Sequence, residues 1–248
     1  GKGAGSSVPV INPGLPLTQV AAQEVLGVAP VFYNDFFVQA QAVPHLNELV
    51  QIGGHKDAVG VKAILGPGSG LGMATLVPNE AGKPTVLSSE GGHGDLAPGS
   101  FLEAELWSVL AQAHQHVSWE TVLSGPGIVN LYQAMSSVWG VESAPKSAEE
   151  IVQQGLAAEP LCHQTLETFA GLLGGAAGNL ALTVGARGGV YISGGIAPKL
   201  ADMLPTSPLR RRFDERGDLS DYAKAIPLYL VMDEQPGLLG ARQMLTDA

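Results

Sequence analysis

An Asn34-Asp35 pair stands within an aromatic stretch that runs from Phe32 to Phe37. The apolar run Val28–Phe32 predicts a strand, which places the pair where a strand ends and a helix begins. In α/β proteins such strand ends carry binding and catalytic groups. An aspartate on an apolar background is also costly unless it is paired or used. The alternative is that Asp35 only caps the helix that follows.

A second constellation is Glu90-Gly91-Gly92-His93, in which two glycines allow a sharp turn between a carboxylate and an imidazole. A metal site has only Asp95 nearby as a further ligand, and the spacing matches no common zinc signature. Hydrogen bonding to a polyhydroxyl ligand suits the pair better, because the carboxylate accepts and the imidazole donates or accepts. A purely structural turn is the alternative.

A glycine-rich turn, Gly66–Gly72, joins the apolar runs Val59–Leu65 and Met73–Val77. Two such runs around a glycine turn predict a β-hairpin. The turn is not a P-loop, since no Lys-Ser/Thr follows it, and it lacks the helix of a dinucleotide fingerprint. Its backbone N–H groups could still form a nest for phosphate oxygens. Any tight hairpin can be glycine-rich, so this motif alone identifies no ligand.

Gly194 and Gly195 follow the predicted strand Val190–Ser193 and permit close backbone approach to a flat ligand such as a purine. Nucleophilic catalysis finds no support, because Gly-x-Ser-x-Gly does not occur and Cys162 has no base partner beyond the adjacent His163. We interpret His163, like His114 and His116, as an ordinary helix or surface histidine.

Composition narrows the class of protein. Of 248 residues 45% are hydrophobic and 33 are glycine, which favours a globular chain with many tight turns. With 13 basic and 23 acidic side chains the net charge is −10, and the one basic run is Leu209–Arg212, so neither nucleic acid nor an anionic membrane is an expected partner. No apolar stretch approaches the roughly 20 residues of a membrane span, and Gly1–Ser7 is no signal peptide. The single cysteine fits a reducing cytosol.

The elements that must position these groups alternate between strands and helices, which indicates an α/β architecture. A further strand is predicted at Pro227–Met232, besides those already named. Apolar periodicity and capping patterns predict helices at Ser100–His116, Ile128–Val138, Ser147–Ala158 and Glu159–Gly185, and a C-terminal helix opening at Pro236. The Glu159–Gly185 segment is rich in Ala and Gly and apolar on most sides, so we expect it to be buried beneath the sheet.

In their order along the chain, these motifs resemble the bacterial-type glucokinase family of the hexokinase/actin-like ATPase superfamily. The resemblance covers nearly all of the chain from about Ala21 onward. It rests on the stretches Asn34–Phe36, Gly66–Gly72, Glu90–His93 with Asp95–Pro98, Val117–Glu120 running into Leu123–Tyr132, Gly178–Leu182, Gly188–Pro198 and Gln235–Gly240.

The resemblance implies a role for each polar residue of these motifs. Asp35 matches the family's catalytic base, which takes the proton of the glucose 6-hydroxyl as it attacks the γ-phosphate of ATP. Asn34 matches a sugar-hydroxyl ligand, and Glu90, His93 and Glu120 match the residues that hold the ring hydroxyls.

For the nucleotide, the resemblance assigns Gly68, Ser69 and Gly70 to the second phosphate loop and Gly194 and Gly195 to the adenosine motif. It implies ATP and Mg²⁺ as cofactors, with no metal-ligating residue assigned. Phosphoryl transfer is coherent with such a site, because it needs positioning and charge stabilisation more than covalent chemistry.

The front of the chain departs from the family pattern. The Asp-x-Gly-Gly-Thr hairpin of the first phosphate loop does not occur, and Ile52–His55 lacks its aspartate. We therefore expect an α/β, ribonuclease H-like (actin-like ATPase) fold with a nearly complete large lobe and a truncated small N-terminal lobe. The predicted division is 1–45 as the small-lobe remnant, 46–235 as the sugar-binding lobe and 236–248 as a helix returning towards the small lobe.

Two functions follow from these matches. The first is an ATP-dependent glucokinase with Asp35 as the base. The second is a catalytically impaired sugar-binding or regulatory relative, or a fragment, that binds glucose without turnover. The expected partners are glucose and ATP, and the expected location is the cytoplasm. A sheet that has lost strands exposes an apolar edge, which predicts either aggregation or a homodimer that covers it.

Overall fold

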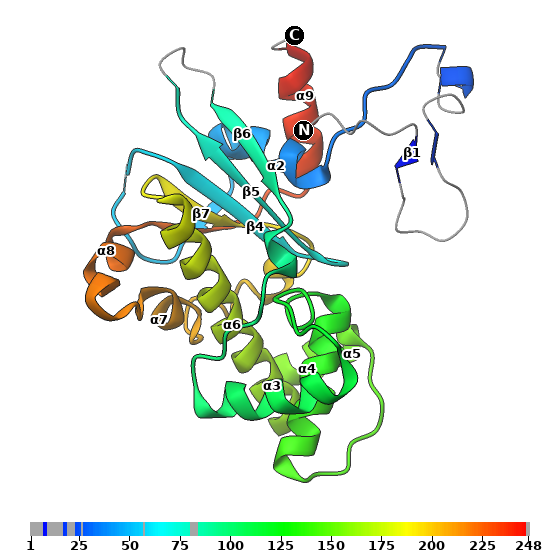
Figure 1. Cartoon of the computed structure of the whole chain (residues 1–248), viewed down its shortest axis with the longest axis vertical. Coiled ribbons are helices and arrows are strands. Elements are labelled where there is room, and N and C mark those ends of the chain that lie inside the picture. Colours follow the sequence, from blue (N-terminus) through cyan, green and yellow to red (C-terminus); the bar gives the residue numbers. More distant parts are fainter. Residues whose placement is uncertain are drawn as a thin grey trace.

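A six-stranded mixed sheet, in the order β3-β8-β7-β4-β5-β6, lies at one end of the molecule (Figure 1). The structure is a computed structural model and describes residues 7–8, 17–18, 23–25, 27–56, 58–79 and 84–246. The strands are β3 (Leu49–Gln51), β4 (Lys62–Pro67), β5 (Leu71–Val77), β6 (Thr85–Ser89), β7 (Gly189–Ile192) and β8 (Leu228–Val231). Two short strands, β1 (Ser7–Val8) and β2 (Leu17–Thr18), pair separately, and the rest of the Gly1–Ser7 stretch lies outside the described residues.

The sheet combines hairpin and crossover connections. The predicted glycine hairpin is β4 and β5, which pair antiparallel, while β7 joins β4 and β8 in parallel. The hairpin ladder continues through Gly66↔Gly72 to Pro67↔Leu71, so the turn is only Gly68-Ser69-Gly70. The predictions of strands at 190–193 and 227–232 are confirmed within one residue at each end. The chain therefore has the expected α/β character with a mixed sheet.

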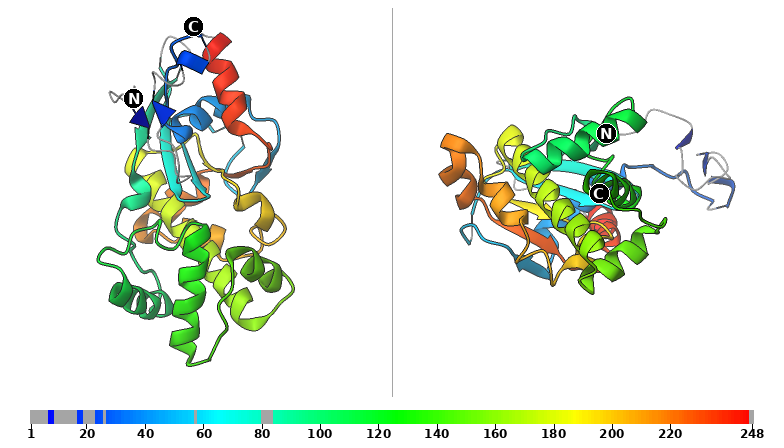
Figure 2. Two further views of the ribbon diagram at one scale, coloured as in Figure 1. Left: turned by 90° about the vertical axis from the view of Figure 1, so that its right-hand side faces the viewer. Right: turned by 90° about the horizontal axis from the view of Figure 1, so that it is seen from below.

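The helices gather mainly on one side of the sheet and beyond its end. In Figure 1, α6 runs from the sheet down to α3, α4 and α5, and Figure 2 (left) shows the C-terminal helix beside the blue α2 at the sheet end. The helices are α2 (Asp35–Ala42), α3 (Phe101–Ala113), α4 (Gly125–Trp139), α5 (Ala148–Leu156), α6 (Pro160–Val184), α7 (Leu209–Asp214), α8 (Ser220–Ala225) and α9 (Pro236–Thr246).

Alternate residues of the strands enter two separate cores, as the period of a β-strand requires. In β4, Ala63 and Leu65 belong to the large core formed with α3, α4, α5 and α6, whereas Ile64 belongs to a smaller one. The smaller core also contains Phe36 and Ala40 of α2, and α9 packs against α2 in turn. The sheet is thus covered on both faces, and α2 is fixed to it by buried side chains.

Local capping signals account for most helix starts. Ser100, Ser124 and Ser147 each accept a hydrogen bond from the backbone N–H three residues on, and Ser147 with Glu150 forms the predicted capping box. The long helix α6 is buried as predicted and contacts β4 and β7. At Gly174 a Cβ would overlap the Leu209 carbonyl oxygen, so a small residue there lets α7 approach closely.

The strand predicted at 28–32 is wrong. The structure has no strand in this segment, and the Val28 and Val31 side chains are 66% and 59% exposed. No described strand pairs with the segment, and a strand needs such a partner for its backbone hydrogen bonds. Asn34 and Asp35 therefore follow irregular chain and open a helix rather than ending a strand.

Both edges of the described sheet are open and each exposes one large apolar side chain, Val50 (39% exposed) in one and Leu87 (53%) in the other. The edge strands are β3 and β6. All residues of β6 except Val86 are exposed, and Leu87 is the one large apolar side chain among them. Both edge strands are short, three residues in β3 and five in β6, and short edges limit pairing with another chain, so a homodimer stays a prediction. No described helix is long and apolar enough to cross a membrane.

Cys162 in the first turn of α6 is expected to be unreactive in the native protein. Burial, with a smaller contribution from Glu159, raises the pKa of the Cys162 thiol to about 12, and the side chain is fully buried. Because the thiolate is the nucleophile, we expect iodoacetamide at pH 8 to alkylate Cys162 at least about a hundredfold more slowly than in urea-unfolded chain. Mass spectrometry over time measures this, and equal rates in both states would contradict the described burial.

Candidate functional site

All ten residues predicted to form the site line one cavity of about 590 Å³ at the turn end of the β4–β5 hairpin. The α2 N-terminus, the hairpin turn, the 90–93 turn, Glu120 and the loop after β7 each contribute to it. The lining includes Asn34, Asp35, Gly68, Ser69, Gly70, Glu90, His93, Glu120, Gly194 and Gly195. The structure therefore brings together groups that lie up to 161 positions apart in the sequence.

The start of α2 fixes the first two of these residues. Asn34, not Asp35, is the N-cap: its Oδ1 accepts a hydrogen bond from the backbone N–H of Phe37 at 3.0 Å. Asp35 Oδ1 accepts from the N–H of Phe36 at 2.9 Å, which leaves its second carboxylate oxygen without a partner among the hydrogen bonds of the described residues. Asp35 is exposed, so the expected cost of an aspartate in apolar surroundings does not arise.

The aromatic neighbours of Asp35 have separate structural roles. Tyr33 and Phe37 stack on each other with ring centroids 5.4 Å apart. Phe36 is buried against the hairpin, where a Cβ on Gly72 would overlap its ring. Glycine in the β5 ladder is therefore required by the docking of α2, and this contact sets the position of Asp35 above the cavity.

The Glu90–His93 segment forms a single 3-10 turn, Gly91–His93, closed by a hydrogen bond from His93 N–H to the Glu90 carbonyl at 3.0 Å. A Cβ on Gly92 would overlap the Leu71 carbonyl oxygen, so the turn packs directly on β5. Among the described residues, no three His, Cys, Asp or Glu side chains are grouped as a metal site. The carboxylate and the imidazole remain exposed and able to bind polar ligands.

Glu120 connects the 90–93 turn to the β4–β5 hairpin. Its Oε2 accepts a hydrogen bond from Leu71 N–H at 2.8 Å, and its own N–H donates to the Gly92 carbonyl at 2.8 Å. Its Oε1 lies 3.9 Å from Nδ1 of His93. A Cβ on Gly70 would lie 2.5 Å from Oε2, so glycine at this turn position makes room for the carboxylate. Glu120 therefore contacts both turns at once.

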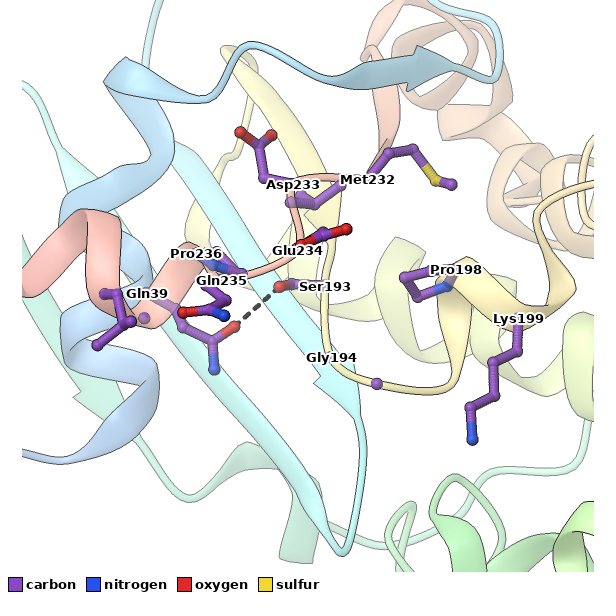
Figure 3. Close-up of a pocket in the computed structure, with 14 residues that line it drawn as sticks. Gln39, Ser193, Gly194, Pro198, Lys199, Met232, Asp233, Glu234, Gln235 and Pro236 are labelled. Carbon is purple, nitrogen blue, oxygen red and sulfur yellow. Dashed lines mark hydrogen bonds between the residues drawn. The ribbon is translucent and has the colours of Figure 1, made fainter.

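The loop after β7 reaches the cavity because β7 is parallel to β4. Ser193 N–H donates to the Leu65 carbonyl at 2.8 Å, and Gly194 adopts a φ of 87° that favours glycine. Gly125 N–H donates to the Gly68 carbonyl at 2.8 Å and ties the start of α4 to the hairpin turn. Two further cavities flank this region, one of about 610 Å³ lined by Ile128, Val152 and Ile196, and one of about 680 Å³ (Figure 3).

The charge of the cavity is negative. Asp35, Glu90 and Glu120 contribute carboxylates, and no described lining residue is a lysine or an arginine. Such a site accepts hydrogen bonds from a neutral polyol readily. An anionic ligand would instead need backbone N–H groups or a cation of its own.

Residue patterns missed three members of this arrangement. Glu120 carries no local signal and entered only through the family resemblance. Gln39, which lines the site, and Ser193, which bonds to Gln39 and lines the neighbouring 680 Å³ cavity, were not singled out at all. Their proximity depends on α2 docking on the sheet, which no short motif encodes.

A family model described as Glucokinase matches residues 10–248. The chain belongs to the glucokinase family. The glucokinase of Campylobacter jejuni subsp. doylei is 43% identical over 85% of this chain and 64% of its own length. That of Chromobacterium violaceum is 43% identical over 92% of this chain and 66% of its own. The chain thus spans slightly less than two thirds of these two glucokinases.

Solved structures agree with the family. The crystal structure of glucokinase from an Antarctic psychrotroph superposes with a TM-score of 0.84 at 38% identity, covering 94% of this chain and 74% of that one. A ROK family glucokinase from Streptomyces griseus, in complex with glucose and AMPPNP, shares the fold at a TM-score of 0.62 and 15% identity, covering 93% and 72%. The mixed α/β fold of the chain is therefore that of glucokinases and ROK kinases.

Proposed function

We propose that the chain phosphorylates glucose at the 6-hydroxyl with ATP, with Asp35 as the general base. The supporting observation is the single cavity in which Asp35, the sugar-side residues Glu90, His93 and Glu120, and the hairpin turn meet. Membership of the glucokinase family supports the reaction class. The chain spans less than two thirds of the length of the two glucokinases compared above. The experiment must therefore test whether the chain itself is active.

The sugar side suits a neutral polyol. The carboxylates of Glu90 and Glu120 accept hydrogen bonds from ring hydroxyls, and His93 donates or accepts according to its protonation. The amide nitrogen of Asn34 is available because its oxygen caps α2. The glucokinase of Balamuthia mandrillaris, which shares the fold at a TM-score of 0.72, was solved in complex with glucose. We assign glucose to this side of the cavity.

On the nucleotide side, Gly68 and Gly195 fit a closely approaching ligand. A Cβ on either residue would meet no atom within 4 Å, and neither has the positive φ that favours glycine. The fold therefore does not require glycine at these positions, whereas a phosphate chain held by backbone N–H groups would. The apolar cavity beside them, lined by Ile128, Val152, Leu156 and Ile196, has the chemistry for a purine ring.

Mg²⁺ fits the site through its substrate rather than through a protein cage. Mg²⁺ keeps several waters and binds nucleotide phosphates with one or two carboxylates. The described cavity offers carboxylates but no cluster of three. When bound, the ion would neutralise phosphate charge in a cavity that has no lysine or arginine among its described lining residues.

Alanine at Gly68 or Gly195 is expected to raise KM for ATP by about tenfold, which corresponds to about 1.4 kcal/mol of lost binding. The free energy of unfolding is expected to change by less than about 1 kcal/mol, since the added methyl meets open space. Steady-state kinetics and urea denaturation measure the two effects. Gly171→Ala in α6 is the control, because its Cβ would meet only ordinary van der Waals contacts at 3.6 Å and Gly171 lines none of the 590, 610 and 680 Å³ cavities. An unchanged KM in both variants contradicts the assignment.

We also propose the ribonuclease H-like fold type and the division into 1–45, 46–235 and 236–248. Support for the last segment comes from α9, which packs on α2 where a Cβ on Gly240 would overlap the Val38 carbonyl oxygen. The C-terminal helix thus returns to the helix that carries Asp35. Support for the fold type comes from the match to glucokinase and ROK kinase structures.

A second function, glucose binding without turnover, is favoured by one observation. The sequence contains no Asp-x-Gly-Gly-Thr motif, while every sugar-side residue is present. A coupled assay with glucose, ATP and magnesium, together with glucose calorimetry, separates the two functions. Turnover that is lost in Asp35→Asn supports the kinase, and glucose binding without turnover supports the binding protein. Absence of glucose binding overturns both.

A further inference from the structure

Gln39 stands one helical turn after Asp35 on α2 and lines the same 590 Å³ cavity. It also lines the 680 Å³ cavity (Figure 3). Together with Gly194 and Gly195 it is common to the two cavities. Residues four apart on a helix lie on one face, so Gln39 and Asp35 border the cavity side by side.

The Gln39 side chain is held in one orientation. The hydroxyl of Ser193, whose side chain is 1% exposed at the end of β7, donates to Gln39 Oε1 at 2.8 Å. Figure 3 shows this contact, with the amide nitrogen of Gln39 directed away from Ser193. Because the amide oxygen is used, the two N–H donors of Nε2 remain, and no hydrogen bond of the described residues involves them.

Donors are scarce where the reaction would take place. The described lining of the Asp35 cavity has no lysine or arginine, and its side-chain N–H donors are the amides of Asn34 and Gln39 and the imidazole of His93. Asn34 and His93 belong to the sugar side. Gln39 follows Asp35 by one helical turn and bonds to Ser193, the residue before Gly194, so it borders the region where the sugar hydroxyl and the nucleotide phosphates would meet. A transferred phosphoryl group carries its charge on peripheral oxygens and is stabilised by donors placed around it.

We propose that Gln39 is a substrate-contacting residue whose amide donates to the γ-phosphoryl group of ATP, and that Ser193 is the positioning residue that orients it. This inference rests on the proposed glucokinase function. In the step it serves, the glucose 6-oxygen bonds to phosphorus as the bond to the β-phosphate oxygen breaks, ADP departs with that electron pair, and Asp35 receives the hydroxyl proton. Gln39 donates hydrogen bonds only and transfers no proton.

The test is the preference for ATP over ADP, because only ATP carries the γ-phosphoryl group. Calorimetry with magnesium and without glucose, so that no phosphoryl transfer to the sugar occurs, measures both nucleotides on the full chain and on Gln39→Glu, Gln39→Leu and Ser193→Ala. Gln39→Glu keeps the acceptor for Ser193 but loses the donors, so we expect ATP affinity to fall about tenfold or more and ADP affinity less than threefold. Gln39→Leu is expected to act in the same direction, and glucose affinity should stay unchanged.

The positioning role predicts non-additivity. Ser193→Ala alone should lower the ATP preference about threefold, yet add nothing in the Gln39→Leu background, since residues acting through one contact are coupled. Gln41→Glu is the matched control: it makes the same change on the same helix, and Gln41 lines neither cavity. The control should retain the ATP preference of the unaltered chain.

Equal losses of ATP and ADP affinity, or no loss in either Gln39 variant, overturn the role of Gln39 and leave the proposed function standing. An unaltered chain that binds glucose but no ATP overturns the kinase function and this inference together. If Gln39→Glu fails to fold, Gln39→Leu and Ser193→Ala decide, because both remove polar atoms without adding charge.

Discussion

Asparagine at Asp35 is expected to lower kcat for glucose phosphorylation by a factor of about 10²–10⁴, the usual contribution of a positioned general base. The amide oxygen of asparagine can still accept the N–H of Phe36, which Asp35 Oδ1 accepts at 2.9 Å, so the start of α2 should remain intact. The amide cannot take the hydroxyl proton. A coupled assay measures kcat, and calorimetry shows whether glucose affinity is retained.

The control for this substitution is Asp202→Asn, which makes the same chemical change at an exposed turn residue outside the cavity. It should leave kcat within a factor of about two, as surface changes usually do. If Asp35→Asn keeps more than a third of the activity of the unaltered chain, Asp35 is not the base.

Alanine at Glu103 is expected to lower the free energy of unfolding by about 3–5 kcal/mol, because it leaves the buried Arg212 guanidinium without its carboxylate partner. Glu103 Oε2 lies 2.9 Å from Arg212 Nη2, and the two side chains are only 8% and 12% exposed. The same oxygen accepts the N–H of Gly99 at 2.6 Å. Arg212 Nε already lacks a hydrogen-bond partner, so loss of Glu103 leaves the guanidinium with little compensation.

Two further variants test whether the loss of stability comes from the unpaired buried charge of Arg212. The double variant Glu103→Leu with Arg212→Met removes both charges and is expected to recover most of the lost stability, since apolar replacements of a buried pair are often neutral. Glu215→Ala breaks the exposed pair with Arg211, whose side chains are 67% and 53% exposed, and should cost less than about 1 kcal/mol. Urea denaturation measures all three. A loss below about 1 kcal/mol in Glu103→Ala would argue against the buried pair.

Part of the site could be predicted from short patterns. The Gly66–Gly72 stretch predicted a hairpin, and the 90–93 stretch predicted a turn carrying Glu90 and His93. Both are set by neighbouring residues, because glycine and hydrogen bonds within a few positions decide the backbone path. Which ligand these turns bind did not follow from either pattern alone. The order of the motifs along the chain supplied that prediction.

Other parts depended on contacts that no short pattern contains. The segment 28–32 is apolar enough for a strand, but it has no strand partner among the described residues, so the local preference is not realised. The sequence predicts Gly72 to be part of the hairpin turn, yet it lies in the β5 ladder and makes room for the Phe36 ring.

By itself, then, the sequence determined the elements that local chemistry controls and the family that their order indicates. The capping box at Ser147 and the hairpin around Ser69 are examples, since each depends on residues within a few positions. Only the tertiary structure decided that Glu120 reaches the N–H of Leu71, 49 residues away, and that Ser193 orients Gln39 across 154 residues. Such contacts form because buried side chains pack distant segments on one sheet: Phe36 and Tyr191 share the smaller core, and Trp119 and Leu71 share the large one. Packing of this kind is a property of the whole core.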